Sequence, residues 1–358
     1  MSPRVAIITG IGGQDGSYLA EFLLEKGYHV YGMIRRHSSM IVLDRLKEAR
    51  KHSGLHLIYG DVTDFSSICN ILREAEADAG DEPIEFYNLA AQSHVKVSFE
   101  TPMYTAQADA VGVLNALEAI VKLGLAQRVR FYQASTSELY GDSPAPQSER
   151  TPFQPRSPYA AAKLFAYWTV RNYKEAYGIF AVNGILFNHE SERRGETFVS
   201  RKVTRAVAEY AHAMQAGGSS PEVLHLGNLN ALRDWGHAKD YIRAMWVMLQ
   251  QAVPEDFVIA TGKSHTVKEL VETAYEVIGV SIRWEGEGAD EKGFNAETGA
   301  LLVQVDPRYY RLTEVNHLCG DASKAREMLG WNPVVGFKEL VEKMVQHDLV
   351  CLTEGLGM

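Results

Sequence analysis

Short apolar runs alternate with amphipathic segments through the first half of the chain. Between the first two runs, apolar residues recur at helical spacing from Tyr18 to Leu23, until Gly27 ends the helix. Strands that alternate with helices form βαβ units, so the pattern predicts an α/β fold with a doubly wound parallel sheet covered on both faces. The runs predict six buried strands: Val5–Thr9, His29–Ile34, Leu55–Gly60, Phe86–Ala90, Arg130–Ala134 and Ala181–Phe187.

The second half of the chain is less regular. Helices are expected at Phe198–Met214 and Val267–Ile278, short strands at Val223–Leu226 and Phe257–Ala260, and a polar surface loop at Gly286–Thr298. The sequence contains no internal repeat, and no linker separates two independent units. We therefore expect a smaller α/β substrate-binding domain that is interleaved with the first. The expected boundaries are 1–187 plus about 236–262 for the nucleotide-binding domain, and 188–235 and 263–358 for the smaller one.

Composition narrows the class of protein. The 358 residues are 46% hydrophobic and carry a net charge of −9, so the overall field opposes binding to nucleic acid or to an anionic membrane. No stretch approaches the roughly 20 apolar residues of a membrane span. Cys69, Cys319 and Cys351 are far apart and have no metal-site spacing, which indicates reduced thiols. With a first strand that starts almost at once, a cytoplasmic location is expected.

The first predicted strand ends in a glycine-rich turn of the form GxxGxxG. Glycines at a strand-to-helix junction allow a tight turn and the close approach of a pyrophosphate, which then lies at the positive N-terminus of the helix. An ordinary tight turn can have the same pattern. Because this turn begins a doubly wound pattern, we interpret it as a dinucleotide site in a Rossmann sheet. The turn consists of Gly10, Ile11, Gly12, Gly13, Gln14, Asp15 and Gly16.

The residues after the second strand indicate which dinucleotide binds. A site for NAD often has an acidic residue here, whereas this chain has Arg35 and Arg36, followed by His37 and two serines. Two guanidinium groups suit a 2′-phosphate, so we infer NADP as the cofactor, with a solvated basic loop as the alternative for Arg36. Further candidates follow the third and fourth strands, at the sheet edge where ligands bind. They are Asp61, Val62, Leu89, Ala90, Ala91, Gln92 and Ser93.

Tyr159 and Lys163 are the first candidates for catalysis. Their i, i+4 spacing places phenol and ammonium on one face of a helix that starts at Pro158. A nearby ammonium favours the phenolate, so we expect a lowered pKa for Tyr159, which could then act as a base. The pair alone can arise by chance in a chain with 17 tyrosines and 36 Lys and Arg residues. Its position after the fifth strand of a nucleotide-binding sheet favours catalysis.

Thr136 and Glu138 follow at the end of the fifth strand. On an extended segment, residues i and i+2 point the same way, so both should face the space beside Tyr159. The oxidation of an alcohol does not require the Glu138 carboxylate, so this group suggests a further step. It could remove a proton next to a newly formed ketone, and a solvated turn carboxylate is the alternative.

Several longer strings resemble the GDP-mannose 4,6-dehydratase family, a branch of the extended short-chain dehydrogenase/reductases. The resemblance implies conversion of GDP-D-mannose to GDP-4-keto-6-deoxy-D-mannose and water, by internal hydride transfer from C4 to C6 through NADP. It also implies a homotetramer built of dimers, in which the Arg35–Arg36 loop reaches the cofactor of a neighbouring subunit. The strings cover nearly the whole chain: GQDGSYLAEFLLEKGY, YQASTSELYG, PRSPYAAAKLFAYW, NGILFNHES, RRGETFVSRK, LRDWGHAKDYIRAMW, EDFVIATG and VDPRYYRLTEV.

The same resemblance implies roles for individual residues. Thr136, Glu138 and Tyr159 match the family's catalytic residues, and Lys163 supports both the tyrosine and the cofactor. The matching cofactor positions are Gly10 to Asp15, Asp61, Val62, Leu89 to Ser93, Tyr104, Lys163, His189 and Arg194. The matching sugar-nucleotide positions are Asn188, Lys202, Arg233, Arg311 and Glu314.

Two observations bear on these roles independently of the resemblance. A run of cations crowds one segment of an acidic protein, which a bound diphosphate would explain, although Arg205 also suits a solvated helix face. The run consists of Arg193, Arg194, Arg201, Lys202 and Arg205. His189 has no second histidine at ligand spacing, so no metal site is expected there.

Two other functions remain open from the sequence. A C4 epimerase or reductase of another sugar nucleotide would need Tyr159 and Lys163 but not Glu138. A non-catalytic NADP-binding sensor would need none of the three.

Overall fold

The computed structural model describes residues 3–36, 44–217, 222–310 and 312–355. Its largest element is a parallel seven-stranded sheet with the order β10-β6-β5-β4-β1-β2-β3. The chain runs outward from β1 to β3 and then returns to β4 on the other side of β1, which creates a switch point where ligands bind in such sheets. The strands are β1 (Val5–Thr9), β2 (His29–Ile34), β3 (Leu55–Tyr59), β4 (Ile84–Asn88), β5 (Val129–Thr136), β6 (Phe180–Leu186) and β10 (Phe257–Ile259).

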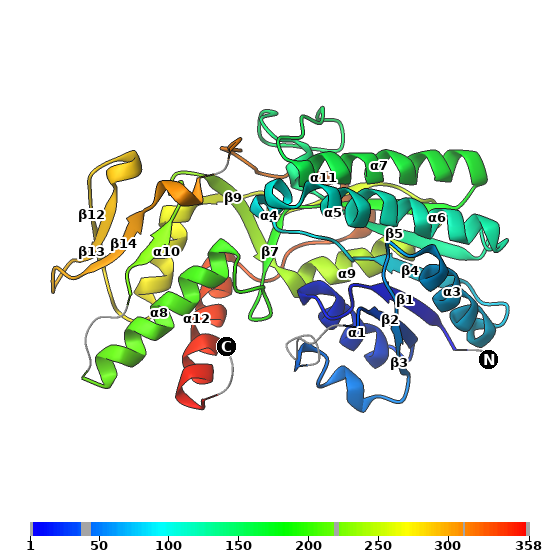
Figure 1. The fold of residues 1–358 in the computed structure, drawn as a ribbon, viewed down its shortest axis with the longest axis horizontal. Helices are drawn as coiled ribbons and strands as arrows, with labels where there is room; N and C mark the ends of the chain where they lie inside the picture. Colours follow the sequence, from blue (N-terminus) through cyan, green and yellow to red (C-terminus); the bar gives the residue numbers. More distant parts are fainter. Residues whose placement is uncertain (1–2, 37–43, 218–221, 311, 356–358) are drawn as a thin grey trace.

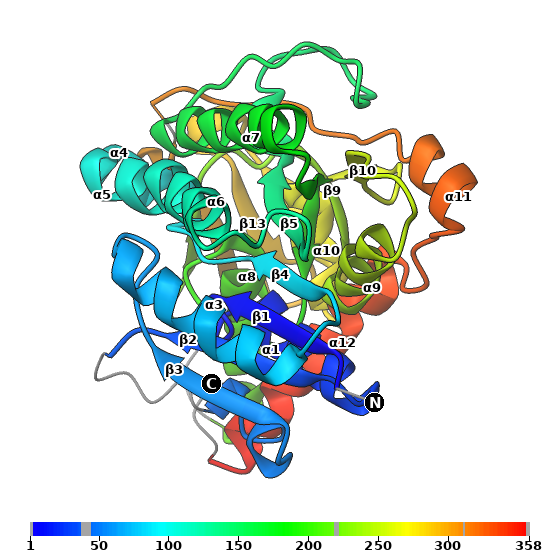
Figure 2. The same ribbon diagram turned by 90° about the vertical axis from the view of Figure 1, so that its right-hand side faces the viewer.

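Helices cover both faces of this sheet (Figure 2). On β1, Ile8 packs in one apolar core with α1 (Gln14–Glu25) and α9 (Ala238–Leu249). Its neighbour Ile7 points to the opposite core, with α3 (Phe65–Ala79), α6 (Gly112–Lys122) and α7 (Pro158–Tyr177). The central strand β1 is buried and apolar over most of its length because both faces of the sheet are covered, and the predicted doubly wound fold is confirmed.

A smaller unit adjoins the sheet (Figure 1). It contains a three-stranded sheet, β11-β9-β7, and a four-stranded sheet, β12-β13-β14-β8. Between β9 and β11 the chain returns to the large sheet as α9 and β10, so the two units are interleaved. The strands are β7 (Asn188–Glu190), β8 (Leu224–Leu226), β9 (Leu232–His237), β11 (Ser264–Thr266), β12 (Ile282–Glu285), β13 (Lys292–Asn295) and β14 (Leu301–Val305), and the main helices are α8 (Val199–Gln215), α10 (Val267–Glu276) and α12 (Phe337–Thr353). Helix α11 (Ser323–Leu329) lies between α10 and α12 in the sequence but packs against β10 and α9 of the large sheet.

Among the sequence predictions that differ from this structure, one concerns β13 and one concerns β4. The expected loop Gly286–Thr298 contains β13, which pairs with β12 on one side and β14 on the other. That prediction was wrong because Lys292-Gly-Phe-Asn295 has none of the apolar alternation of a strand. β4 ends at Asn88 rather than at the expected Ala90, so Leu89 and Ala90 lie beyond the strand, at the ligand edge. The exact domain boundaries remain a prediction.

In the part of the chain that the structure describes, no helix combines the length and the apolar content that crossing a bilayer requires.

Candidate functional site

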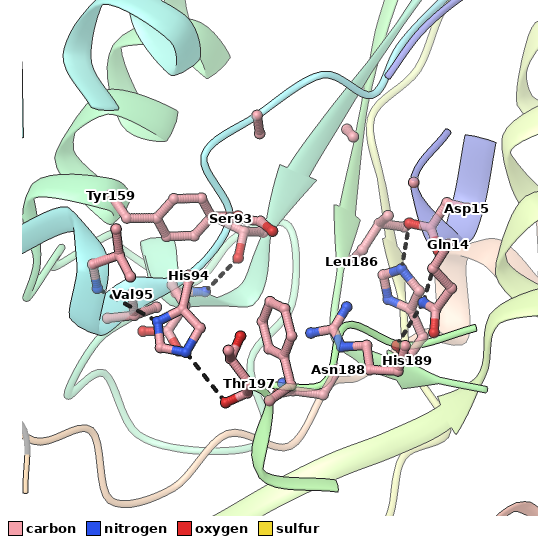
Figure 3. A pocket seen from close by; sticks show the side chains of 18 of the residues that line it. Gln14, Asp15, Ser93, His94, Val95, Tyr159, Leu186, Asn188, His189 and Thr197 are labelled. Carbon is pink, nitrogen blue, oxygen red and sulfur yellow. Dashed lines mark hydrogen bonds and ion pairs between the residues drawn. The ribbon is translucent and has the colours of Figure 1, made fainter. Parts of the chain in front are cut away.

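A cavity of about 780 Å³ opens at the carboxyl ends of the central strands and extends into the smaller unit. Its walls combine the glycine turn after β1, the residues after β4 and β5, the start of α7, and residues of β7, α8 and β9. Figure 3 shows Tyr159 on one side of this cavity and the group Gln14, Asp15 and His189 on the other. A volume of this size can hold an extended ligand or two adjacent ones.

The glycine turn is shaped by close backbone contacts. Gly10 has φ +69°, and a Cβ there would lie 2.8 Å from the Ala90 nitrogen. A Cβ on Gly16 would lie 2.4 Å from the Gly10 carbonyl oxygen. The turn therefore requires glycine at both positions, and it brings the amides at the start of α1 to the cavity wall. This arrangement fits a pyrophosphate.

The structure places most predicted turn residues in the cavity wall. Gly10, Gly12, Gly13, Gln14 and Asp15 all line it. Ile11 does not: its side chain is fully buried in the core, against β2 at Gly32. Because the turn is so tight, its one large apolar side chain packs beneath the sheet edge rather than toward a ligand.

Alanine at Gly16 is expected to damage both this turn and cofactor binding. The added methyl would meet backbone atoms, which cannot rotate away, and overpacking of this kind costs about 1–3 kcal/mol of the free energy of unfolding. Thermal unfolding and cofactor titration should both show the loss. Gly336→Ala is the control, because a Cβ there would meet nothing within 4 Å. Equal effects of the two substitutions would contradict this account of the turn.

The next part of the wall contains most of the residues predicted after β3 and β4. These are Asp61, Val62, Leu89, Ala90, Ala91 and Ser93, together with Arg35 and Tyr104. The Arg35 guanidinium donates a hydrogen bond to the Tyr104 hydroxyl. A smaller hollow adjoins this end, lined by Arg35, Arg36, Tyr59, Gly60, Asp61 and Ser67. His37, Ser38 and Ser39 lie outside the described residues.

Gln92 departs from its predicted role. It is not part of the cavity wall, because its side-chain amide donates to the His94 carbonyl and the Thr105 hydroxyl, both at 3.2 Å. Arg45, in contrast, was missed and lines the cavity, with its guanidinium 3.3 Å from the Gly12 carbonyl. No pattern in the sequence around Arg45 distinguishes it from a surface arginine.

Tyr159 and Lys163 lie on the first turns of α7, as their spacing predicted. The Ser157 hydroxyl accepts a hydrogen bond from the Ala160 amide and so caps the helix, with Pro158 at its first position. Lys163 donates to the Ala134 carbonyl at 3.1 Å, and its Nζ is 5.8 Å from the centre of the Tyr159 ring. Both side chains are buried and line the cavity.

The prediction of a lowered pKa for Tyr159 is wrong: the surrounding protein groups, without substrate or cofactor, raise this pKa. Burial and the negative charge of Asp109 raise the pKa of this phenol, and a hydrogen bond with Thr136 opposes them only in part. Burial also lowers the pKa of Lys163. A desolvated ammonium at this distance therefore does not turn Tyr159 into a phenolate.

Asp109 is a buried carboxyl that sequence reasoning missed. It lies on a π-helical turn, Gln107–Val111, where its Oδ1 accepts a hydrogen bond of 2.7 Å from the backbone amide of Gln92. Its Oδ2 has no hydrogen-bond partner among the described residues. Burial raises the pKa of Asp109 to about 6, and Lys163 counteracts part of that rise. The only signal in the sequence was an acidic residue within an otherwise apolar helical stretch.

Thr136 and Glu138 both line the cavity, although their backbone differs from the prediction. Thr136 is the last residue of β5, and a 3₁₀ turn, Ser137–Leu139, begins directly after it instead of an extended segment. The Thr136 hydroxyl accepts the Glu138 amide at 3.2 Å. Both side chains are at most 8% exposed. A carboxylate thus lies in the same wall as the tyrosine.

Asp15, on α1, and His189, on β7, connect the two units on one side of the cavity (Figure 3). The His189 Nε2 lies 2.7 Å from the Asp15 Oδ2, and its ring stacks on Tyr241 with centroids 4.6 Å apart. Burial disfavours both charges, but their mutual attraction outweighs it. The pKa of Asp15 is therefore lowered and that of His189 raised.

This pair should stabilise the fold mainly in mildly acidic solution. The contribution of Asp15 is present above its unfolded pKa of about 3.9 and is lost as pH falls through the lower folded value. The contribution of His189 is present below its unfolded pKa of about 6.5 and is lost as pH rises through the higher folded value. The melting-temperature difference between wild type and Asp15→Asn should therefore be largest between about pH 4 and 6.5. A pH-independent difference would contradict the pairing.

The far end of the cavity belongs to the smaller unit and carries cations. The predicted Lys202 lies over the Tyr309 ring, 4.2 Å from its centroid, and Lys96, which was not predicted, lies 5.3 Å from the same centroid. Burial and the charge of Lys96 lower the pKa of Lys202. Arg233 pairs with Glu314 at 3.7 Å. The predicted Asn188 lines the cavity beside His189 (Figure 3), whereas Arg311 lies outside the described residues.

Only part of the run of cations at 193–205 reaches the cavity. Of its five members, Arg194 and Lys202 line the cavity. The other three pair elsewhere: Arg193 with Glu21, Arg201 with Asp348, and Arg205 with Glu196. Only Arg194 and Lys202 therefore remain candidates for binding a diphosphate in this cavity.

Comparisons with known proteins agree with this architecture. Residues 7–344 match the family model described as GDP-mannose 4,6 dehydratase. GDP-mannose 4,6-dehydratase of Sinorhizobium fredii is 55% identical over 97% of this chain and 97% of its own length. The human GDP-mannose 4,6 dehydratase is 54% identical over 97% of this chain and 92% of its own length.

A solved structure shows the same fold at lower sequence similarity. The UDP-glucose 4-epimerase of Thermus thermophilus, in complex with NAD, superposes with a TM-score of 0.74 at 24% identity, covering 96% of this chain and 98% of its own. The family model and the two close relatives each span almost the full length. The chain therefore belongs to the GDP-mannose 4,6-dehydratase family.

Proposed function

We propose that this protein is a GDP-mannose 4,6-dehydratase, which converts GDP-D-mannose to GDP-4-keto-6-deoxy-D-mannose and water with NADP as the hydride carrier. The observation that carries the proposal is the presence of Tyr159 and Glu138 in the wall of one cavity, next to a glycine turn shaped for a pyrophosphate. Family membership supports the same reaction.

Each side chain has one task in this reaction. Tyr159 takes the proton of the sugar C4 hydroxyl, which requires its raised pKa to fall when substrate and cofactor bind. The bound nicotinamide would accept the C4 hydride and return it to C6. Glu138 removes the C5 proton, which the C4 ketone has made acidic, and passes it to the C6 hydroxyl, which leaves as water. Thr136 holds the C6 region by hydrogen bonding, and Lys163 holds the nicotinamide ribose. A proton then returns to C5.

The choice of NADP rests on the arginines near the end of β2. Arg35 borders both the main cavity and the adjoining hollow. Arg45 lies against the glycine turn, where burial lowers its pKa and Glu196 opposes that effect. A guanidinium binds phosphate through paired hydrogen bonds. A nicotinamide dinucleotide is the general class of cofactor, and the 2′-phosphate is the finer inference.

Arg35→Ala is expected to weaken NADP binding at least about tenfold and to leave NAD binding almost unchanged, because one charge-assisted hydrogen bond is worth about 1.5–3 kcal/mol. Fluorescence titration with both dinucleotides measures this. An equal loss for the two would show that Arg35 acts only through its contact with Tyr104.

The sugar nucleotide is assigned to the end of the cavity in the smaller unit. Its diphosphate would meet Lys96 and Lys202, two cations that both lie over the partly exposed Tyr309 ring. Arg233 and Asn188 line the same cavity. Guanine and mannose are inferred from the family, because these side chains recognise a diphosphate without specifying its base.

We further propose that the protein is a homotetramer, a dimer of dimers. Phe165 and Trp168 on α7 are about half exposed, and Met103 nearby is 74% exposed. Apolar patches of this kind are typical of subunit contacts. A cytoplasmic location remains a prediction from the sequence.

Internal hydride transfer can be tested with GDP-mannose that carries deuterium at C4. The proposal predicts product with the deuterium at C6, formed with only catalytic NADP⁺. Deuterium that accumulates in the cofactor pool would instead indicate a reductase or dehydrogenase. Deuterium retained at C4, without water loss, would indicate an epimerase, and binding without any transfer would indicate a sensor.

A further inference from the structure

Two histidines and an aspartate converge at the edge of the large sheet that is opposite the cavity. His29 begins β2, His56 lies near the start of β3, and Asp78 lies in the last turn of α3. One potential ligand atom from each of the three residues lies within 4.8 Å of those of the other two. We propose that this triad binds a divalent transition-metal ion of the zinc class.

The backbone brings these side chains together on one face of the sheet. Tyr31 is the register partner of His56 across the β2–β3 ladder, and His29 precedes Tyr31 by two residues. Residues two apart on a strand point the same way, so all three belong to one face. Helix α3, which carries Asp78, packs on that face, because Tyr31 shares one apolar core with the buried side chains of α3. The triad therefore stands on rigid elements.

Part of the triad is already paired and part is not. The His29 Nδ1 is 2.7 Å from the Asp78 Oδ2. The His56 Nε2 is buried and has no hydrogen-bond partner among the described residues. A buried polar nitrogen without a hydrogen-bond partner costs free energy of folding. That cost would be removed if one nitrogen of the His56 ring bound a metal ion and the other were solvated. The Tyr31 ring stacks on His56 with centroids 4.7 Å apart and holds the imidazole plane in place.

The surroundings favour a cation. The Tyr31 hydroxyl lies 3.2 Å from the Asp78 Oδ2, an outer contact of the kind that orients a carboxylate ligand. Asp78 is at the C-terminal end of α3, where the helix dipole is negative. The charge of Glu74 also reaches this hydroxyl. The field at the triad is therefore negative before any ion binds.

The donor set selects the kind of ion. Two imidazole nitrogens and one carboxylate oxygen, with a fourth position open to solvent, suit zinc and cobalt rather than magnesium or calcium, which require oxygen ligands. Tetrahedral coordination separates neighbouring ligand atoms by about 3.4 Å. The histidine–aspartate contact would need to open by about 0.7 Å to reach that geometry. His29 and Asp78 are 39% and 28% exposed, so their side chains have room to adjust.

Binding can be measured on the full chain after removal of metals with a chelator. Equilibrium dialysis against Zn²⁺ or Co²⁺ should give one ion per chain, and the cobalt form should show the visible absorption of a tetrahedral site. A saturating ion should raise the melting temperature by about 5 °C. Mg²⁺ should produce none of these changes, and the dehydratase activity should stay the same, because the triad is remote from the cavity.

Three variants test the assignment. His29→Gln, His56→Gln and Asp78→Asn should each weaken Zn²⁺ binding at least tenfold and abolish the metal-dependent melting shift. His212→Gln, at an exposed position on α8, is the matched control and should bind as wild type does. Melting curves without metal establish that each variant is folded. Wild type that binds no more Zn²⁺ than the His29→Gln variant would overturn the proposal and leave an ordinary histidine–aspartate hydrogen bond.

Discussion

Glutamine in place of Glu138 is expected to slow water loss from GDP-mannose by about 10²–10⁴-fold, the usual contribution of a positioned general base. The amide keeps the size of the side chain but cannot accept the C5 proton. Oxidation at C4 does not need this carboxylate, so a single turnover of the variant should still transfer hydride from C4. The elimination step alone should fail.

Deuterium oxide provides a second measurement of the same step. Wild type should place solvent deuterium at C5 of the product, and Glu138→Gln should leave the C5 hydrogen of the sugar unexchanged. Glu100→Gln is a suitable control, because Glu100 is exposed at the end of α4 (Val95–Glu100) and outside the cavity wall. Water loss at the wild-type rate in Glu138→Gln would assign the base to another group.

Phenylalanine at Tyr159 is expected to lower kcat by about 10³-fold through loss of the proton acceptor for the C4 hydroxyl. Hydride transfer itself should stop in this variant, whereas it survives in Glu138→Gln, so the two substitutions arrest different steps. Rapid mixing with GDP-mannose should produce a transient absorbance of reduced cofactor only where Tyr159 is present. Tyr177→Phe, on the exposed end of the same helix, is the control.

The pH dependence should change as well. Burial and Asp109 raise the pKa of Tyr159, so the phenol is neutral through the ordinary range and the fraction of active base grows as pH rises. The wild-type rate should therefore increase with pH, and Tyr159→Phe should flatten that rise. An unchanged pH profile in the variant would contradict a role for Tyr159 as the base.

The large sheet could be predicted from the sequence because its strands are buried on both faces. Val5–Thr9 and His29–Ile34 are apolar throughout or nearly so, and both strand boundaries are confirmed. The edges of the smaller unit could not be predicted in the same way. β13 reads Lys-Gly-Phe-Asn, and it is a strand because β12 and β14 offer hydrogen bonds on both sides. Tertiary pairing overrode the local pattern there.

The site shows the same limit. Tyr159 and Lys163 are four residues apart on a helix, so local geometry alone brings them together. Asp109 could not be predicted from local spacing, because its effect on the pKa of Tyr159 depends on the packing of a π-helical turn against α7. The local run of cations suggested that Arg201 binds a phosphate. In the structure Arg201 pairs instead with the buried Asp348, 147 residues later. Partners that are distant in the chain determine what a charged side chain does.

The most direct measurement is incubation of the purified protein with GDP-mannose, UDP-glucose and dTDP-glucose, each with a trace of NADP⁺, followed by mass spectrometry of the products. The account predicts loss of one water from GDP-mannose alone, in many turnovers per cofactor. Absence of water loss from all three, in a protein that still binds the cofactor, would contradict it.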